Sequence, residues 1–134
     1  MSRSLLSKLR QMDPYRFEHF VADLWEQMEF QTEVIQQSQD RGIDVRATRP
    51  PSETVLIQAK RHGPESMVRG PKIREYAGLY KQEEGIDKVY VVTTNRFTSQ
   101  ARETADECGV ELVDSERLTE LINQYGRDNF VNSY

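Results

Sequence analysis

The segment QDRGIDVRATRPPSETVLIQAKR, residues 39–61, contains two strand-like runs joined by a proline-rich turn. The predicted turn residues are Arg49, Pro50, Pro51 and Ser52. Because the chain folds back there, Asp44 at the start of the first strand is expected beside the end of the second, which carries Gln58 and Lys60. Side chains alternate between the faces of a strand, so Gln58 and Lys60 share one face. The segment therefore predicts a hairpin with an acid, an amide and an amine gathered at one end.

Three polar groups at the end of an apolar strand have two interpretations. The first is a buried ion pair between Asp44 and Lys60, since an unpaired buried charge is costly. The second is a divalent metal site with three oxygen ligands, because Mg2+ prefers oxygens: the Asp44 carboxylate, the Gln58 side-chain oxygen and the main-chain carbonyl of Ala59. Lys60 would then orient or deprotonate the attacking water, or neutralise charge that builds on a phosphate. The residues alone leave both interpretations open.

The runs GIDV at 42–45 and IQAK at 57–60 resemble the catalytic core of the Mrr-like restriction endonucleases. These enzymes are a branch of the PD-(D/E)xK nuclease superfamily in which Gln often replaces the middle acidic residue. The resemblance covers most of positions 9 to 122, and it includes MDP at 12–14, FE at 17–18, VTT at 92–94, Phe97 and Ala101. It implies that Asp44, Gln58 and Lys60 are the catalytic triplet and that Glu18, on the first long helix, completes the site. With the resemblance, we favour the metal site over the ion pair.

The resemblance implies a metal-dependent endodeoxyribonuclease that hydrolyses DNA phosphodiester bonds with Mg2+ or Mn2+, with restriction of foreign or modified DNA as a role. Two alternatives stay open. One is a catalytically silent DNA-binding module of the same fold, since Gln58 is a weaker ligand than a carboxylate. The other is a structure-selective nuclease that acts on junctions, because one fold hosts both activities.

Family members usually carry a separate DNA-reading domain, and we expect none within these residues. We therefore expect one of three situations. The nuclease cuts with little sequence preference, it depends on a partner protein, or the chain is a piece of a longer protein. A duplex cutter needs two sites, which favours a homodimer.

The chain has 134 residues, which fits one domain. We expect a nuclease domain over 1–126 and a frayed tail over 127–134. The chain is 37% apolar and 30% charged, without an apolar run near the roughly 20 residues that a membrane span needs and without a signal-peptide pattern. We therefore expect a cytoplasmic protein with no membrane contact. The single cysteine, Cys108, excludes an internal disulfide and a cysteine-based zinc cluster.

Charge is distributed unevenly along the chain, although the net charge is -4. Positions 60–74 contain one acidic residue, Glu65, and five basic residues, a surplus of four positive charges. The basic residues are Lys60, Arg61, Arg69, Lys72 and Arg74. Over positions 101–134 three basic residues face eight acidic ones. Phosphate contacts come from Lys, Arg and amide donors, so Arg61, Arg69, Lys72 and Arg74 are predicted to bind DNA. The alternative is a solvated helix face.

Hydrophobic periodicity and capping residues predict the remaining elements. Helices are expected over 4–11, over 14–28 with Asp13 as N-cap, from Pro71, from Thr98 to Gly109, and from Asp114 or Ser115. Strands are expected over 30–37, in the hairpin, over 88–94 and over 110–113, with 88–94 as the central strand because it is apolar on both faces. This order indicates an α/β domain, and the resemblance implies the restriction-endonuclease-like αβββαβ core with a mixed central sheet flanked by helices.

Overall fold

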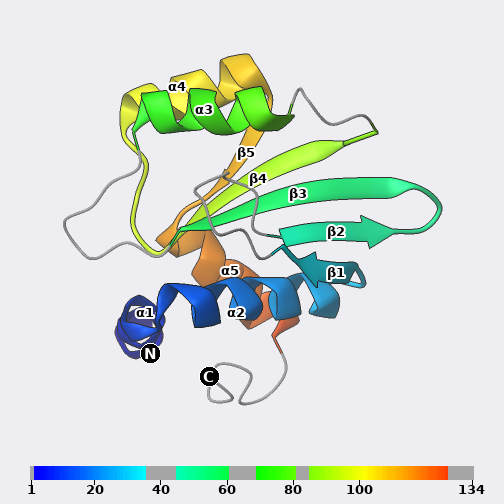
Figure 1. Ribbon diagram of the computed structural model, residues 1–134. Coiled ribbons are helices and arrows are strands. Elements are labelled where there is room, and N and C mark those ends of the chain that lie inside the picture. The colour runs from blue at the N-terminus through cyan, green and yellow to red at the C-terminus, as the bar shows by residue number, and fades with distance from the viewer. Residues whose placement is uncertain (1, 36–44, 61–68, 81–84, 127–134) are drawn as a thin grey trace.

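The computed structural model describes residues 2–35, 45–60, 69–80 and 85–126, with backbone alone at residues 2–4, 60, 79 and 80 (Figure 1). Five helices and five strands lie in these ranges. The helices are α1 (Ser2–Gln11), α2 (Pro14–Gln27), α3 (Gly70–Tyr80), α4 (Ser99–Cys108) and α5 (Ser115–Tyr125). The strands are β1 (Gln31–Val34), β2 (Val45–Arg49), β3 (Glu53–Lys60), β4 (Lys88–Thr93) and β5 (Val110–Val113). The predicted order of elements is confirmed over these residues.

The five strands form one mixed sheet in the spatial order β1-β2-β3-β4-β5. The first three strands are antiparallel neighbours, whereas β3 pairs parallel with β4 and β4 parallel with β5. The carboxyl ends of β3 and β4 therefore meet at one edge of the sheet, where Lys60 pairs with Thr93. The prediction that 88–94 is the central strand is wrong, because β3 occupies the middle position. Both strands have neighbours on each side, so an apolar run cannot distinguish one from the other.

Helices cover both faces of the sheet, α1, α2 and α5 on one face and α3 and α4 on the other (Figure 1). The first core contains Phe17, Phe20 and Trp25 of α2 against Val55, Ile57 and Ala59 of β3. The second core packs α3 and α4 on the opposite face, where Leu56 of β3 meets Ile73 and Ala101. Even-numbered and odd-numbered side chains of β3 thus enter different cores, as strand alternation requires.

Capping residues define the helix ends as the sequence predicts. Asp13 accepts a hydrogen bond from the amide of Tyr15, Thr98 from that of Ala101, and Asp114 from that of Arg117. Each of these bonds satisfies an amide that has no partner inside its helix. No helix among the described residues is long and apolar enough to cross a membrane.

Candidate active site

The β2–β3 hairpin folds back as predicted over its described part. Val45 pairs with Ile57 at one end of the ladder, and Arg49 pairs with Glu53 at the other. Arg49 was predicted as a turn residue, but it is the last residue of β2, because its guanidinium binds the Glu53 carboxylate at 2.8 Å and so extends the pairing. Asp44 precedes Val45 in the chain and lies outside the described residues. The start of β2 therefore lies beside the end of β3, as the predicted site requires.

Gln58 is a buried amide near the carboxyl end of the middle strand. It is 2% exposed and shares a face of β3 with Leu56, on the side that α3 and α4 cover. The residue makes contacts of its own, and its side-chain oxygen Oε1 is buried without a hydrogen bond from the residues that the structure describes. A buried acceptor of this kind loses its hydrogen bond to water on folding, which is unfavourable unless another donor or a cation binds it. An oxygen of this kind fits a hard cation, since Mg2+ and Mn2+ bind oxygen ligands.

Ala59 and Lys60 complete the end of β3. Ala59 is 4% exposed and pairs with Val92, and its side chain belongs to the core under α2. Lys60 pairs with Thr93 through its backbone, while its side chain lies outside the described residues. The shared face of Gln58 and Lys60 therefore stays a prediction.

Glu18 lies half-buried near the start of α2. Two hydrogen bonds orient this helix. Arg49 Nη1 donates to the carbonyl of Met28 at 3.3 Å, which holds the carboxyl end of α2 near the hairpin turn. Arg10 Nε donates to the carbonyl of Thr94 at 3.0 Å, which holds the chain ahead of α2 near the end of β4. The first turns of α2 therefore lie toward the carboxyl ends of β3 and β4, although α2 and Gln58 occupy opposite faces of the sheet.

Polar residues to which the sequence analysis gave no role are buried at the end of β4 and directly after it. Thr93 and Thr94 are fully buried and Asn95 is 3% exposed. The Asn95 amide donates to Thr93 Oγ1 at 3.1 Å, and the Asn95 carbonyl accepts from the Ser115 amide at 2.9 Å. These bonds fix the segment in place. The sequence signal for these residues is the polar run TTN at 93–95 directly after an apolar run. Such a run is expected at the carboxyl end of a strand, where α/β sheets bind ligands.

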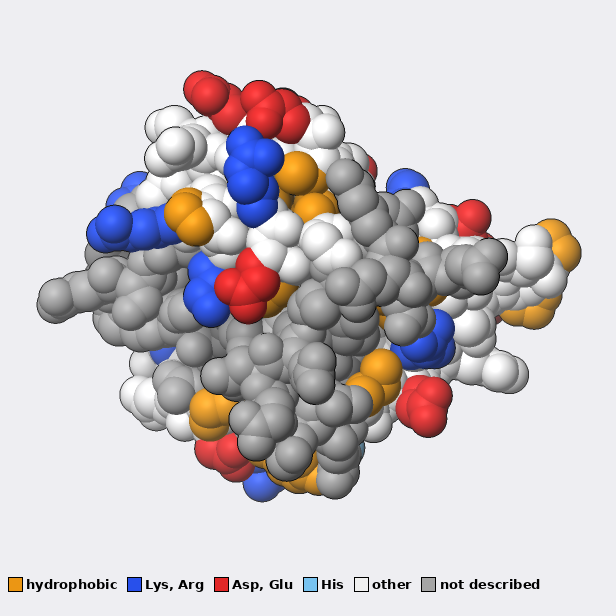
Figure 2. Space-filling model, turned by 45° about the horizontal axis from the view of Figure 1, so that its top comes forward, with side chains coloured by type: hydrophobic (Ala, Val, Ile, Leu, Met, Phe, Trp, Pro, Cys, Tyr) orange, Lys and Arg blue, Asp and Glu red, His pale blue; other side chains and the backbone are white. Residues whose placement is uncertain are grey.

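Three of the four predicted DNA-binding residues lie in α3 or directly before it. Arg69, Lys72 and Arg74 are exposed, and Arg61 lies outside the described residues. Lys72 pairs with Glu75 at 3.6 Å, and Arg74 pairs with Glu107 at 3.4 Å. Figure 2 shows this face with Lys and Arg side chains interspersed among Asp and Glu. Acidic residues that lie nearby in the fold thus partly balance the positive charge that was counted along the sequence.

A comparison with known protein families identifies the family of this chain. The profile of the Mrr_cat family, described as a restriction endonuclease, matches residues 9–122. The chain belongs to the Mrr-like restriction endonuclease family. No curated protein matches the chain. The match spans the hairpin, Glu18 and the segment after β4 within one continuous stretch.

Solved structures share the fold of this Mrr-like domain at low sequence identity. The restriction endonuclease AspBHI, titled as DNA modification-dependent, aligns with a TM-score of 0.77 and 16% identity over 98% of this chain and 38% of its own. MspJI, solved with a 27-mer oligonucleotide, aligns with a TM-score of 0.73 and 20% identity over 98% of this chain and 35% of its own. AF1548, a protein of unknown function, aligns with a TM-score of 0.74 and 22% identity over 85% of this chain and 67% of its own. The chain thus spans little more than a third of the two restriction endonucleases.

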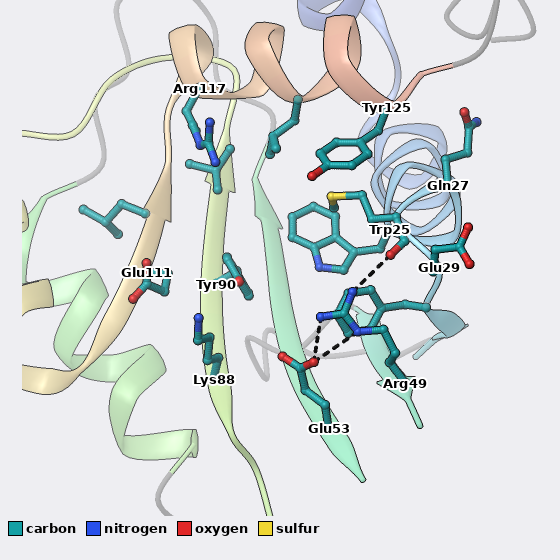
Figure 3. Close-up of a pocket in the computed structure, with 15 residues that line it drawn as sticks. Trp25, Gln27, Glu29, Arg49, Glu53, Lys88, Tyr90, Glu111, Arg117 and Tyr125 are labelled. Atoms are coloured by element: carbon teal, nitrogen blue, oxygen red, sulfur yellow. Dashed lines mark hydrogen bonds and ion pairs between the residues drawn. The ribbon is translucent and has the colours of Figure 1, made fainter. Parts of the chain in front are cut away.

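A cavity of about 620 Å3 in the Mrr-like domain lies away from the predicted site (Figure 3). Trp25, Tyr90 and Tyr125 face it, beside Lys88 at the start of β4. Lys88 and Thr93 are the two ends of β4, roughly 16 Å apart along a strand. The lining runs along β4 and β5 from Lys88 to Val113, which pairs with Val92. The cavity therefore lies on the face of the sheet that α2 and α5 cover, whereas Gln58 lies on the face that α3 and α4 cover. Among the described residues no cluster of three His, Cys, Asp or Glu side chains adds a second candidate metal centre.

Proposed function

We propose that this domain is a metal-dependent endodeoxyribonuclease that hydrolyses phosphodiester bonds in DNA. The observation that carries the proposal is the buried amide of Gln58 near the end of the middle strand, at the position that the family resemblance implies as catalytic. An amide oxygen is one of the oxygen ligands that Mg2+ and Mn2+ bind.

Asp44, Gln58 and the main-chain carbonyl of Ala59 would hold Mg2+ or Mn2+, which as a Lewis acid stabilises charge on a phosphoryl group. Lys60, two residues after Gln58 in β3, orients or deprotonates the attacking water, or neutralises charge that builds on the phosphate. Glu18 assists by accepting a hydrogen bond from that water at the end of the sheet. Water adds to phosphorus, the bond to one ester oxygen breaks, and the products are a phosphomonoester and a hydroxyl.

The basic residues Arg61, Arg69, Lys72 and Arg74 are proposed to contact backbone phosphates, and the last three of them are exposed. Lys72 and Arg74 each have an acidic neighbour, but exposed ion pairs are worth about 0 to 1 kcal/mol, so a phosphate readily exchanges with these partners. Such contacts provide affinity without sequence information.

Restriction of foreign or modified DNA is the proposed role. It is supported by family membership and by the fold shared with AspBHI, whose title states dependence on DNA modification. Because this domain spans 38% of that chain, we propose that a further domain or partner protein supplies target choice. We also propose a homodimer, since cutting both strands needs two sites.

The test is incubation of supercoiled plasmid with the wild-type protein in Mg2+, in Mn2+ and in EDTA, and with Asp44→Ala and Lys60→Ala. The proposal predicts nicking that requires the metal and falls by on the order of a hundredfold or more in both variants. A Lys88→Ala variant, changed at the far end of β4, serves as the matched control and should cut as the wild type does.

Binding of the plasmid without metal-dependent nicking by the wild type would contradict the nuclease proposal and support a catalytically silent DNA-binding module. Equal nicking by wild type and Asp44→Ala would show that the activity arises elsewhere.

A further inference from the structure

The cavity under α2 and α5 is bordered by aromatic rings that the proposed cleavage chemistry does not use. Its volume of about 620 Å3 lies within the range of roughly 300 to 1,000 Å3 that small-molecule sites usually have. Trp25 of α2 and Tyr90 of β4 line it, with their rings edge-to-face at 5.3 Å between centroids. Tyr125 lines it from α5 (Figure 3). A ligand in this space would meet three aromatic side chains.

Tyr125 extends the apolar stripe of α5 beyond the core. Leu118, Leu121 and Ile122 of this stripe are buried against the sheet. Tyr125 follows Leu121 by four residues and Ile122 by three, so it lies on the same side of the helix. Its side chain is nevertheless 39% exposed, as one of two exposed large hydrophobic residues in the described part of the chain. The stripe therefore ends in a ring at the cavity rather than in the core.

Hydrogen-bonding groups lie beside these rings. Tyr90 pairs with Glu111 of β5, so their side chains are neighbours on one face of the sheet, and both line the cavity. Burial raises the pKa of the Tyr90 phenol, which is therefore a protonated donor at neutral pH. The Glu111 carboxylate is an acceptor. The cavity thus presents a donor and an acceptor next to each other.

The charges around the cavity are balanced. Among the described residues that line it, three basic side chains match three acidic ones. Arg49 binds Glu53 at 2.8 Å, and Arg117 binds Glu120 at 3.1 Å. Because the two guanidinium groups have acidic partners, the lining does not select an anion. These observations favour a neutral ligand.

A neutral, flat ligand whose edge carries both donors and acceptors fits this lining. Nucleobases have these properties, and they stack on aromatic side chains with little dependence on sequence. We propose that the cavity binds a nucleobase, with its ring against Tyr125 and its edge toward Tyr90 and Glu111. The base belongs either to a free nucleoside or to an unpaired position in a DNA strand. The site is separate from the proposed cleavage site, because Gln58 lies on the other face of the sheet.

Trp25 allows a direct test, because it is the single tryptophan of the chain and it lines the cavity. Its fluorescence is titrated in EDTA with adenosine, guanosine, cytidine, thymidine and, as a ligand without a base, ribose. A single-stranded oligonucleotide and its blunt duplex form the second arm. The proposal predicts saturable quenching by at least one nucleoside or by the single strand, with a Kd on the order of 1 mM or tighter, and none by ribose. Quenching by the single strand alone identifies the unpaired DNA base as the source.

Variants assign the binding to the cavity. Tyr125→Ala should weaken it about tenfold through loss of stacking, whereas Tyr125→Phe keeps a ring and should bind within about twofold of wild type. Glu111→Ala should weaken binding about fivefold through loss of a hydrogen bond. Tyr15→Ala is the matched control, since Tyr15 is the other exposed aromatic residue and lies at the opposite end of α2 from Trp25. It should bind as the wild type does.

The absence of saturable quenching by every nucleoside and by the single strand would overturn the inference. Wild-type affinity in both Tyr125→Ala and Glu111→Ala would also overturn it, as would an equal loss in Tyr15→Ala and Tyr125→Ala. If Tyr125→Ala does not fold, Glu111→Ala alone is decisive. The result is independent of the nuclease proposal. A protein that nicks plasmid but shows no base binding refutes only the cavity site, and a protein that binds bases but never nicks refutes only the nuclease.

Discussion

Tyr90 of β4 is half-buried, and its ring meets Trp25 edge-on at 5.3 Å between centroids. Burial raises the pKa of its phenol above the ordinary value of 10.0, and the nearby charge of Lys88 opposes this in part. The folded state therefore favours the neutral phenol. The stability that this gives is fully present below the unfolded pKa and is lost as pH rises through the folded pKa.

Replacing Tyr90 with Phe should remove this dependence. Between about pH 9 and about pH 11, urea unfolding of the wild type should lose more stability than unfolding of Tyr90→Phe, while the two should run parallel below pH 9. Identical curves across the whole range would show that burial of this phenol does not couple to folding.

At the level of single residues, the triplet Asp44, Gln58 and Lys60 stays a prediction, suggested by polar groups that interrupt an apolar strand. The observed register confirms only that the start of β2 lies beside the end of β3. Arg10 was not predictable, because its position depends on a bond to Thr94 across 84 residues. A charged residue in the last turn of a helix is ordinary in sequence, since it also suits the helix dipole.

At the level of elements, α4 offers a direct test of capping. Thr98 Oγ1 accepts from the Ala101 amide at 3.0 Å. Thr98→Ala should lower the free energy of unfolding by about 1 kcal/mol, measured in urea, because the amide loses its acceptor. Thr98→Ser retains the oxygen and should restore most of this loss. Equal destabilisation by Ser and Ala would assign the effect to lost packing of the threonine methyl group.

Two glycines should respond to alanine in opposite directions. Gly109 ends α4 with a φ of 74°, in the left-handed region, whereas Gly78 lies exposed inside α3, and an added Cβ meets nothing within 4 Å at either position. Gly109→Ala should destabilise by about 1 kcal/mol through backbone strain, and Gly78→Ala should stabilise by about 0.5 to 1 kcal/mol through helix propensity. Thermal melting of both variants against wild type measures the contrast. A shift of the same sign in both would contradict it.

Elements and their ends were largely predictable because caps and periodicity are local. The order of strands in the sheet was not, and the expectation that 88–94 is central was wrong. An apolar run shows that a strand is covered on both faces, but its rank in the sheet depends on pairing between distant segments. The end of β2 was misplaced for a similar reason, since the Arg49–Glu53 ion pair extends the ladder into the expected turn.

At the level of the whole molecule, buried polar residues gather at one end of the sheet. The carboxyl ends of β3 and β4 collect the buried polar residues Gln58, Thr93, Thr94 and Asn95, with basic residues approaching from α1 and α3. A separate cavity lies against α2 and α5, on the face of the sheet opposite Gln58. We propose that cleavage takes place at the carboxyl ends of β3 and β4, in line with family membership.

The central claim is that Gln58 supplies an oxygen to a cation in the cleavage site. The most direct measurement is Mn2+-dependent nicking of supercoiled plasmid by wild type, Gln58→Glu and Gln58→Leu, each confirmed as folded by circular dichroism. The account predicts that Gln58→Glu, which keeps an oxygen ligand, nicks within about tenfold of wild type, and that Gln58→Leu loses on the order of a hundredfold or more. Nicking by Gln58→Leu at the wild-type rate and metal concentration would contradict it.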